Sequence, residues 1–173
     1  MHIFVIVMIT LEDFLENAQV EGICDEYRDR VVNCGSKKQL MDMALTAKGS
    51  DYLCDAIAKG WGASPSEISK RFAPYINGRY TLDNGDYESA MYCQYNGSIE
   101  CKTTLLTLIE CNIEVEVPKY HICEIYACGK CNISVKGKGQ VLVVTYGNPN
   151  DVILQCDMDI RCKRLRKKER DGD

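Results

Sequence analysis

The chain has 173 residues, of which 46% are hydrophobic and 27% are charged, and its formal net charge at pH 7 is −4. These values are ordinary for a globular protein, and the length is sufficient to bury a core that needs no covalent or metal staple. Seven of the 21 basic residues lie in the last thirteen positions, so the chain is an acidic body with a basic C-terminal end.

The eleven cysteines are a high and odd number. In a small secreted domain they would indicate a disulfide framework. The apolar run Met1–Ile9 has no basic segment before it, however, and the acidic Glu12 and Asp13 follow it. It therefore does not resemble a signal peptide, and nine residues are too few to span a bilayer. We expect a cytoplasmic protein whose reduced thiols act mainly as small apolar side chains.

Helical spacing of apolar residues dominates residues 1–76. Segments beginning at Leu11 and Ile23 show this spacing first. Ser36 with Gln39 forms a capping box that predicts a helix ending at Gly49, and a further apolar face ends at Gly60. The sequence Ser64-Pro65-Ser66-Glu67 supplies an N-cap and a proline at the first helical position, which predicts a helix that stops before Pro74. The first part of the chain is therefore expected to be helical.

After Pro74 the apolar period changes to two, which is typical of strands. Asn77-Gly78 predicts a hairpin, because a type I′ turn needs two positive φ angles, and Asp83-Asn84-Gly85 and Asn96-Gly97 show the same turn chemistry. Alternating residues in Ile113–Val117 and Ile133–Val135 are expected to form buried strand faces. We divide the chain into a helical region (1–76), a region of repetitive strands (77–160) and a basic tail (161–173).

One short motif occurs twice in the strand region. Cys111-Asn112-Ile113-Glu114-Val115 recurs twenty residues later as Cys131-Asn132-Ile133-Ser134-Val135. Similar short strands at a fixed spacing are typical of stacked β-coils, although such arrays usually contain at least three repeats. The expected fold class is α+β, in which the β-rich half is either a short β-solenoid or β-roll or an ordinary antiparallel sheet.

Four residues of the strand region have the chemistry of metal ligands: His121, Cys123, Cys128 and Cys131. Four such side chains can hold zinc, and the cysteine spacing with Cys162 also matches a [2Fe–2S] site. Against the cluster, Cys123 and Cys128 would point to opposite faces of one strand. Against zinc, the sequence has only one Cys-x-x-Cys pair, whereas zinc ribbons usually have two. The alternative is that cysteines recur because the strand recurs, and on this interpretation the protein needs no cofactor.

The basic residues near the C-terminus form a candidate contact for nucleic-acid phosphates, because clustered cations release counterions on binding. The alternative is a solvated tail that aids solubility. The residues concerned are Arg161, Lys163, Arg164, Arg166, Lys167, Lys168 and Arg170.

Catalytic chemistry is not indicated by the sequence. With His2 and His121 as the only histidines, a Cys–His pair would have to use His121, and no phosphate-binding glycine loop is present. Aromatic residues instead suggest a face for a partner protein, since tyrosine suits surfaces that are partly wet and partly apolar. The candidate residues are Trp61, Tyr75, Tyr80, Tyr87, Tyr92 and Tyr95.

Three stretches carry a resemblance to known sequences. Lys48-Gly49-Ser50-Asp51-Tyr52-Leu53-Cys54, with Ala58-Lys59-Gly60-Trp61-Gly62 and the region from Phe72 to Tyr80, resembles small uncharacterised proteins of phages and mobile elements in gut anaerobes. The resemblance spans residues 36–155 and brings no known activity or catalytic residue. It implies a context in which accessory proteins often bind host defence enzymes, including CRISPR nucleases.

The resulting hypothesis is a non-enzymatic protein that binds a host protein in the host cytoplasm and inhibits a defence nuclease by occluding its nucleic-acid channel. Two alternatives stay open: a structural or cargo protein of a virion, and an accessory protein that binds nucleic acid through its basic tail.

Overall fold

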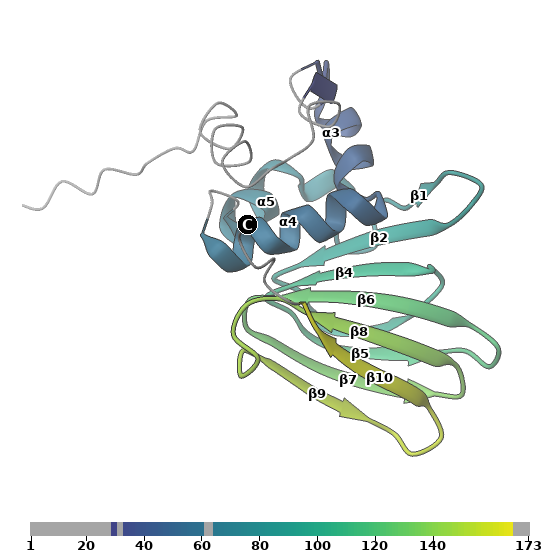
Figure 1. Cartoon of the computed structure of the whole chain (residues 1–173). Coiled ribbons are helices and arrows are strands. Elements are labelled where there is room, and N and C mark those ends of the chain that lie inside the picture. The colour runs from purple at the N-terminus through teal and green to yellow at the C-terminus, as the bar shows by residue number, and fades with distance from the viewer. Residues whose placement is uncertain (1–28, 31–32, 61–63, 168–173) are drawn as a thin grey trace, which may run out of the picture.

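The computed structural model of the chain describes residues 29–30, 33–60 and 64–167. Within them, helices come first and strands follow, as the expected fold class requires (Figure 1). The predicted segments that begin at Leu11 and Ile23 lie almost wholly outside the described residues. The elements are α3 (Lys37–Ala44), α4 (Ala47–Lys59), α5 (Pro65–Arg71), the 3-10 turn η1 (Ala73–Tyr75), β1 (Leu82–Asp83), β2 (Glu88–Cys93), β3 (Asn96–Glu100), β4 (Leu105–Ile109), β5 (Asn112–Val117), β6 (Ile122–Cys128), β7 (Cys131–Gly137), β8 (Gln140–Thr145), β9 (Val152–Cys156) and β10 (Arg161–Arg166).

Two of the helices begin at the capping residues that the sequence predicts. The Ser36 hydroxyl accepts a hydrogen bond from the amide of Gln39 at 3.2 Å, and Ser64 caps α5 in the same way. The prediction that Gly49 ends a helix is wrong. Thr46 instead caps a new helix, its hydroxyl accepting from the Gly49 amide at 3.0 Å, so Gly49 lies in the first turn of α4. That helix ends at Gly60, which adopts φ 70° as a left-handed cap.

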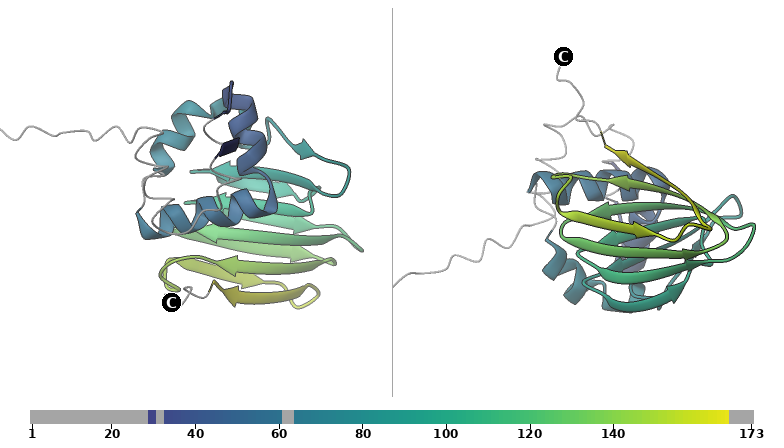
Figure 2. Two further views of the ribbon diagram at one scale, coloured as in Figure 1. Left: turned by 45° about the horizontal axis from the view of Figure 1, so that its top comes forward. Right: turned by 90° about the horizontal axis from the view of Figure 1, so that it is seen from below.

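The strands form two sheets between which the chain alternates. Sheet A has the order β1-β2-β4-β6-β8-β10, and sheet B has the order β3-β5-β7-β9. Every pairing is parallel except that of β1 with β2. Each coil contributes one strand to sheet A and the next to sheet B, which gives a two-sheet β-solenoid (Figures 1 and 2). Of the two predicted architectures the solenoid is confirmed, and the antiparallel sheet is wrong.

The repeated motif forms the sheet B strand of two consecutive coils. β5 and β7 pair so that Asn112 lies opposite Asn132, and Ile113 opposite Ile133. Copies of the motif therefore stack in register, and side chains of the same kind contact each other from coil to coil. Ile113 and Ile133 point into the solenoid and are 3% and 0% exposed. Their burial confirms the predicted strand face.

Two apolar cores lie on the two sides of sheet A. The first fills the solenoid between the sheets, where alternate residues of every coil are buried, among them Leu106, Ile125 and Val135. The second lies between the outward side of sheet A and the helices, and Leu45 and Tyr146 are its largest fully buried side chains. The helices α4 and α5 contact strands of sheet A, so its outward face is covered (Figure 2).

Asn77-Gly78 adopts the predicted turn geometry without forming a hairpin. Both residues have positive φ, 57° and 81°, as a type I′ turn requires. The turn follows η1 rather than a strand, so the predicted hairpin is wrong. Asn77 instead lies against the edge of β2, where its amide donates to the carbonyl of Met91 and its side-chain oxygen accepts from the amide of Cys93. Asn96-Gly97 likewise begins β3, and Gln94 at φ 50° makes the turn before it.

The predicted basic tail is in part a strand. Arg161–Arg166 forms β10, which pairs with β8 along its whole length from Gln140 to Thr145. The strand region therefore extends to residue 166 rather than ending at residue 160. Backbone hydrogen bonds explain why this basic segment is a strand. β10 pairs with backbone groups of β8 that would otherwise lie at an open sheet edge, and these bonds do not depend on the side chains of β10.

We predict that replacement of Gly139 by alanine strongly destabilises the solenoid. A Cβ at this position would lie 2.6 Å from the carbonyl oxygen of His121 and 2.7 Å from that of Pro118, and neither backbone atom can yield easily. We expect Gly139→Ala to lower the free energy of unfolding by about 3 kcal/mol, the upper end for overpacking, as measured by chemical denaturation.

Gly85→Ala is the control, because a Cβ there meets no atom within 4 Å and only the positive φ of 85° is costly. It should cost about 1 kcal/mol. A smaller effect for Gly139→Ala than for Gly85→Ala would contradict the close packing of the coil corner.

Candidate functional site

The outward face of sheet B is the uncovered surface of the solenoid. Among the described elements, the helices pack on sheet A and leave the outer side of β3, β5, β7 and β9 open to solvent (Figure 2). Parallel sheets are usually covered on both faces. Here the outward positions of sheet B are polar apart from Ile153 on β9, so the exposed face is compatible with water. The polar positions comprise Asn96, Ser98, Glu100, Asn112, Glu114, Glu116, Asn132, Ser134, Lys136 and Gln155.

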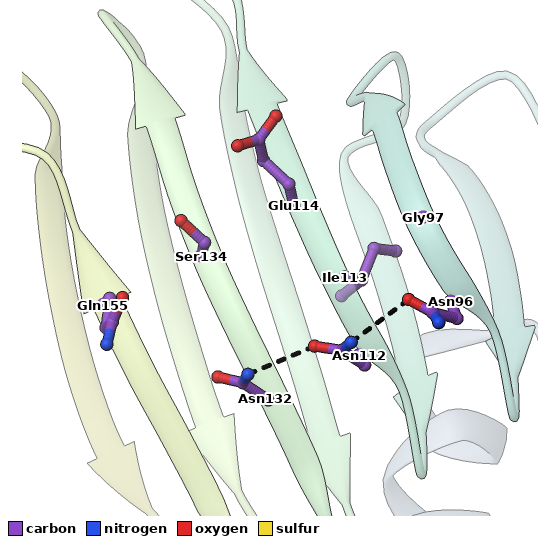
Figure 3. Close-up of a pocket in the computed structure, with 8 residues that line it drawn as sticks. All are labelled: Asn96, Gly97, Asn112, Ile113, Glu114, Asn132, Ser134 and Gln155. Carbon is purple, nitrogen blue, oxygen red and sulfur yellow. Dashed lines mark hydrogen bonds between the residues drawn. The ribbon is translucent and has the colours of Figure 1, made fainter.

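A row of asparagines crosses this face. The Asn112 side-chain amide donates to the side-chain oxygen of Asn96, and Asn132 donates to Asn112 in the same way, each at 3.1 Å (Figure 3). Each amide thus holds its neighbour in one rotamer. The row also leaves unused hydrogen-bonding groups along its length, since a primary amide has two donor hydrogens and two acceptor lone pairs.

A charged row runs parallel to the asparagines. Glu100 and Glu116 are register neighbours, and Glu116 lies beside Lys136 on the next strand. Lys136 forms a salt bridge of 2.6 Å with Glu114. Both partners of this salt bridge are about 40% exposed, so it contributes little to stability. Three glutamates against one lysine give the face a net negative charge.

A shallow hollow lies between these rows. Its walls come from all four strands of sheet B (Figure 3). The polar groups that face it are amides, one hydroxyl and one carboxylate, and it offers no aromatic platform. This chemistry suits polar contacts with a partner surface better than enclosure of a small apolar ligand. The lining residues are Asn96, Gly97, Asn112, Ile113, Glu114, Asn132, Ser134 and Gln155.

The predicted tyrosine face is not a single exposed surface. Tyr75 and Tyr80 pack edge to face at 5.7 Å and lie against the core under the helices. Tyr92 and Tyr95 pack at 5.0 Å against the core of the solenoid. All four are half-buried, as is Tyr87. The structure thus assigns four of these five tyrosines to the packing of two different cores, and Trp61 lies outside the described residues.

The predicted nucleic-acid residues divide into three groups. Arg161, Lys163, Arg164 and Arg166 are exposed on β10. Lys167 instead forms a salt bridge with Asp51 of α4, which ties the end of β10 to the helices. Lys168 and Arg170 lie outside the described residues.

The four predicted metal ligands are not brought together. Cys123 points into the solenoid core, whereas Cys128, five residues along the same strand, points into the core under the helices. Cys131 lies in the solenoid core, and His121 contacts Cys101 rather than these thiols. Across the described residues, no group of three or more such side chains is placed to hold a metal ion. The hypothesis of a zinc site at these four residues is therefore wrong. The hypothesis of an iron–sulfur cluster is wrong for the same reason.

Most described cysteines instead serve as small core residues. Seven of the ten described thiols are buried, and Cys111 and Cys131 occupy the same corner of consecutive coils. Burial raises the pKa of the Cys111 thiol to about 11 and that of Cys131 to about 12. These thiols therefore stay protonated and poorly reactive at neutral pH.

Cys101 is the exception, and its position was not predicted from the sequence. Its sulfur lies 3.8 Å from His121 Nε2, and that nitrogen lies 2.8 Å from the carbonyl oxygen of Thr103. A hydrogen bond from the Cys123 thiol is the main cause that lowers the pKa of Cys101, to about 6. The same contact raises the pKa of Cys123. Cys101 is only 2% exposed, so a substrate has no path to this thiol in the structure.

Exposed apolar residues occur in loops that the sequence patterns did not single out. Tyr120 is 84% exposed, Ile122 63% and Met158 fully exposed, and all three lie at the loops that connect a sheet B strand to the next sheet A strand. The signal in the sequence was weak, because single apolar residues beside Pro118 or Asp157 are common in loops.

Comparison with known proteins gives no relative: no family model, no curated protein and no solved structure matches the chain. In the described part of the chain, no helix has the length and apolar character needed to cross a membrane.

We predict that Cys101 makes stability depend on pH. Its pKa is lowered from 9.0 to about 6 on folding, so its thiolate stabilises the folded state fully above pH 9 and loses this contribution as the pH falls toward 6. The difference in unfolding free energy between wild type and Cys101→Ser should therefore increase from pH 6 to pH 9. Denaturant titrations with a reductant present measure it.

Cys111→Ser is the matched control. The pKa of Cys111 is raised on folding, so its contribution is constant below pH 9 and falls only at higher pH. The difference between wild type and Cys111→Ser should thus be flat over the same interval. A flat difference for Cys101→Ser as well would show that Cys101 remains a thiol.

Proposed function

We propose that this chain is a non-enzymatic protein-binding protein whose binding surface is the outward face of sheet B. One observation carries the proposal: among the described residues, sheet A is covered by helices, whereas the largely polar outward face of sheet B has no element packed on it. A sheet face in which every central strand is paired on both sides is rigid before a partner arrives. Binding to such a face costs little conformational entropy.

The charge of this face favours a basic partner. The register neighbours Glu100 and Glu116 repel each other, and a cation from a partner would relieve that repulsion. Amides of the asparagine row add hydrogen bonds beside the charges. Complementary charge and polar contacts of this kind set the specificity and the association rate of an interface.

We further propose the inhibition of a host defence nuclease as the biological role. Nuclease channels are basic because they hold phosphates, and an acidic, rigid face can compete for them by occlusion. Origin from a phage or mobile element and action in the host cytoplasm belong to this proposal and derive from the sequence resemblance.

A second candidate function is nucleic-acid binding through β10. Four exposed cations lie on this short strand, Arg161, Lys163, Arg164 and Arg166. A strand holds alternate side chains on opposite faces, so at most half of them meet one phosphate backbone at a time. This geometry is less favourable than an acidic face that meets a basic partner. A structural role in a virion is the remaining alternative.

The test removes the charge of the proposed face. We predict that Glu100→Gln/Glu116→Gln weakens the retention of a basic partner from bacterial lysate by about tenfold, equivalent to about 1.4 kcal/mol. Immobilised protein, mass spectrometry of the bound fraction and the nuclease activity of that fraction on a labelled duplex are the measurements. Circular dichroism verifies that the variant is folded.

Asp83→Asn/Asp86→Asn is the matched control, because it removes the same charge from the β1–β2 hairpin in sheet A and keeps the side-chain oxygens that accept in the turn. It should retain the partner like wild type. Equal retention by all three proteins would contradict the assignment of the face. Full nuclease activity at saturating protein would contradict the inhibitor role.

A further inference from the structure

The two ends of the solenoid are built differently. At the first coil, the edge of β2 is covered by β1 and by Asn77, so its backbone groups are satisfied. At the last coil, β9 and β10 each have a strand partner on one side only within the described residues. Repeat proteins need a polar cap at such ends. The last coil has none among the described elements, which leaves backbone groups ready to pair with another strand.

Apolar side chains are also exposed at this last coil. Leu154 and Cys162 point into the solenoid but are only half-buried, because no further coil covers them. Ile153 is 56% exposed and Leu165 is 41% exposed on the outer sides of the same two strands. A terminal coil with open edges and uncovered apolar residues is therefore incomplete on its own.

The ends carry opposite charge. From Arg161 to Lys167 there are five cations and no carboxylate. From Leu82 to Glu88, at the opposite edge of the same sheet, there are three carboxylates and no cation. Sheet A therefore has a basic edge at β10 and an acidic edge at the β1–β2 hairpin.

We propose that copies of this chain associate head to tail, with the last coil of one copy against the first coil of the next. β10 and β1 are the two edges of sheet A, and β9 and β3 are the two edges of sheet B. Translation of a copy along the solenoid axis therefore brings β10 to the acidic hairpin and β9 to the free edge of β3. Both sheets then continue through the contact, and Leu154 and Cys162 are covered.

Charge excludes the symmetric alternatives. A two-fold contact between two last coils would place the cations of β10 against each other, and one between two first coils would oppose Asp83, Asp86 and Glu88. The head-to-tail arrangement pairs unlike charges at every contact. Such a heterologous contact does not close on itself unless a rotation forms a ring, so association grows with concentration.

Nucleic acid is a less complete occupant of the same edge. A phosphate backbone would neutralise Arg161 and its neighbours but would leave the amides of β9 and the side chain of Leu154 uncovered. The second copy satisfies the charges, the backbone edge and the apolar residues together. The association uses the ends of the solenoid and is independent of the partner face proposed above.

A charge exchange tests the proposal. Sedimentation of the full-length protein should show concentration-dependent association for wild type, and both Lys163→Glu/Arg166→Glu and Asp83→Lys/Asp86→Lys should reduce the association constant at least tenfold. In an equimolar mixture, the unaltered β10 of the hairpin variant can meet the unaltered hairpin of the β10 variant. The wild-type contact is then available again, so the two variants should associate with each other. Lys70→Glu/Lys130→Glu, which changes the same number of charges on α5 and in the β6–β7 turn, should associate like wild type.

The outcomes separate the possibilities. Recovery in the mixture and in neither variant alone supports head-to-tail stacking, and it cannot arise from misfolding of either variant. Wild type that stays monomeric at all concentrations overturns the proposal. Binding of a labelled random duplex by monomeric wild type, lost in Lys163→Glu/Arg166→Glu, also overturns it and assigns the basic edge to nucleic acid.

Discussion

In-register stacking of parallel coils is the constraint on which the rest of this structure depends. Ile113 lies beside Ile133 and Val115 beside Val135, so two buried rows cross neighbouring coils. A shift of the strand register by one residue would turn both rows to solvent. The same register places Asn112 on Asn132 outside, where the side-chain amides bond each other. The inner apolar rows and the outer polar rows are thus two consequences of one alignment.

The helices bury apolar residues of sheet A that the solenoid alone would leave exposed. The outward side of sheet A carries apolar residues such as Met91 and Ile109, which a two-sheet solenoid alone would expose. α4 lies across β4 and β6 while α5 contacts β2, and these apolar residues are buried. Tyr146 joins the two parts through a hydrogen bond to Asp51 at 2.6 Å. Burial raises the pKa of Tyr146, which keeps its hydroxyl protonated as the donor. Sheet B has no such apolar outer row, and this difference makes one face structural and the other available.

The sequence predicts those features that local chemistry decides. Caps at Ser36 and Ser64 and the repeat around Asn112 and Asn132 are short-range signals, and the structure confirms them. Features decided by pairing between distant segments were missed. Asn77-Gly78 has the predicted turn angles, yet the residues on its two sides do not form the two strands of a hairpin. Arg161–Arg166 forms a strand because it pairs with the edge of β8. The spacing of Cys123 and Cys128, in contrast, predicted that they point to opposite faces of one strand, and the structure places them in different cores.

The candidate site was the hardest feature to foresee, because it is defined by what does not cover it. Nothing in Asn-x-Glu-x-Glu along β5 distinguishes a binding face from ordinary solvated strand positions. The face becomes a candidate only because neighbouring coils align Glu116 with Glu100 and the helices that the structure describes pack on the other sheet. The same reasoning holds for the ends, where β10 and the β1–β2 hairpin acquire opposite charge as edges of one sheet. A solenoid thus converts position along the sequence into position along an axis, and charge that is unevenly distributed in the chain becomes a polarity of the molecule.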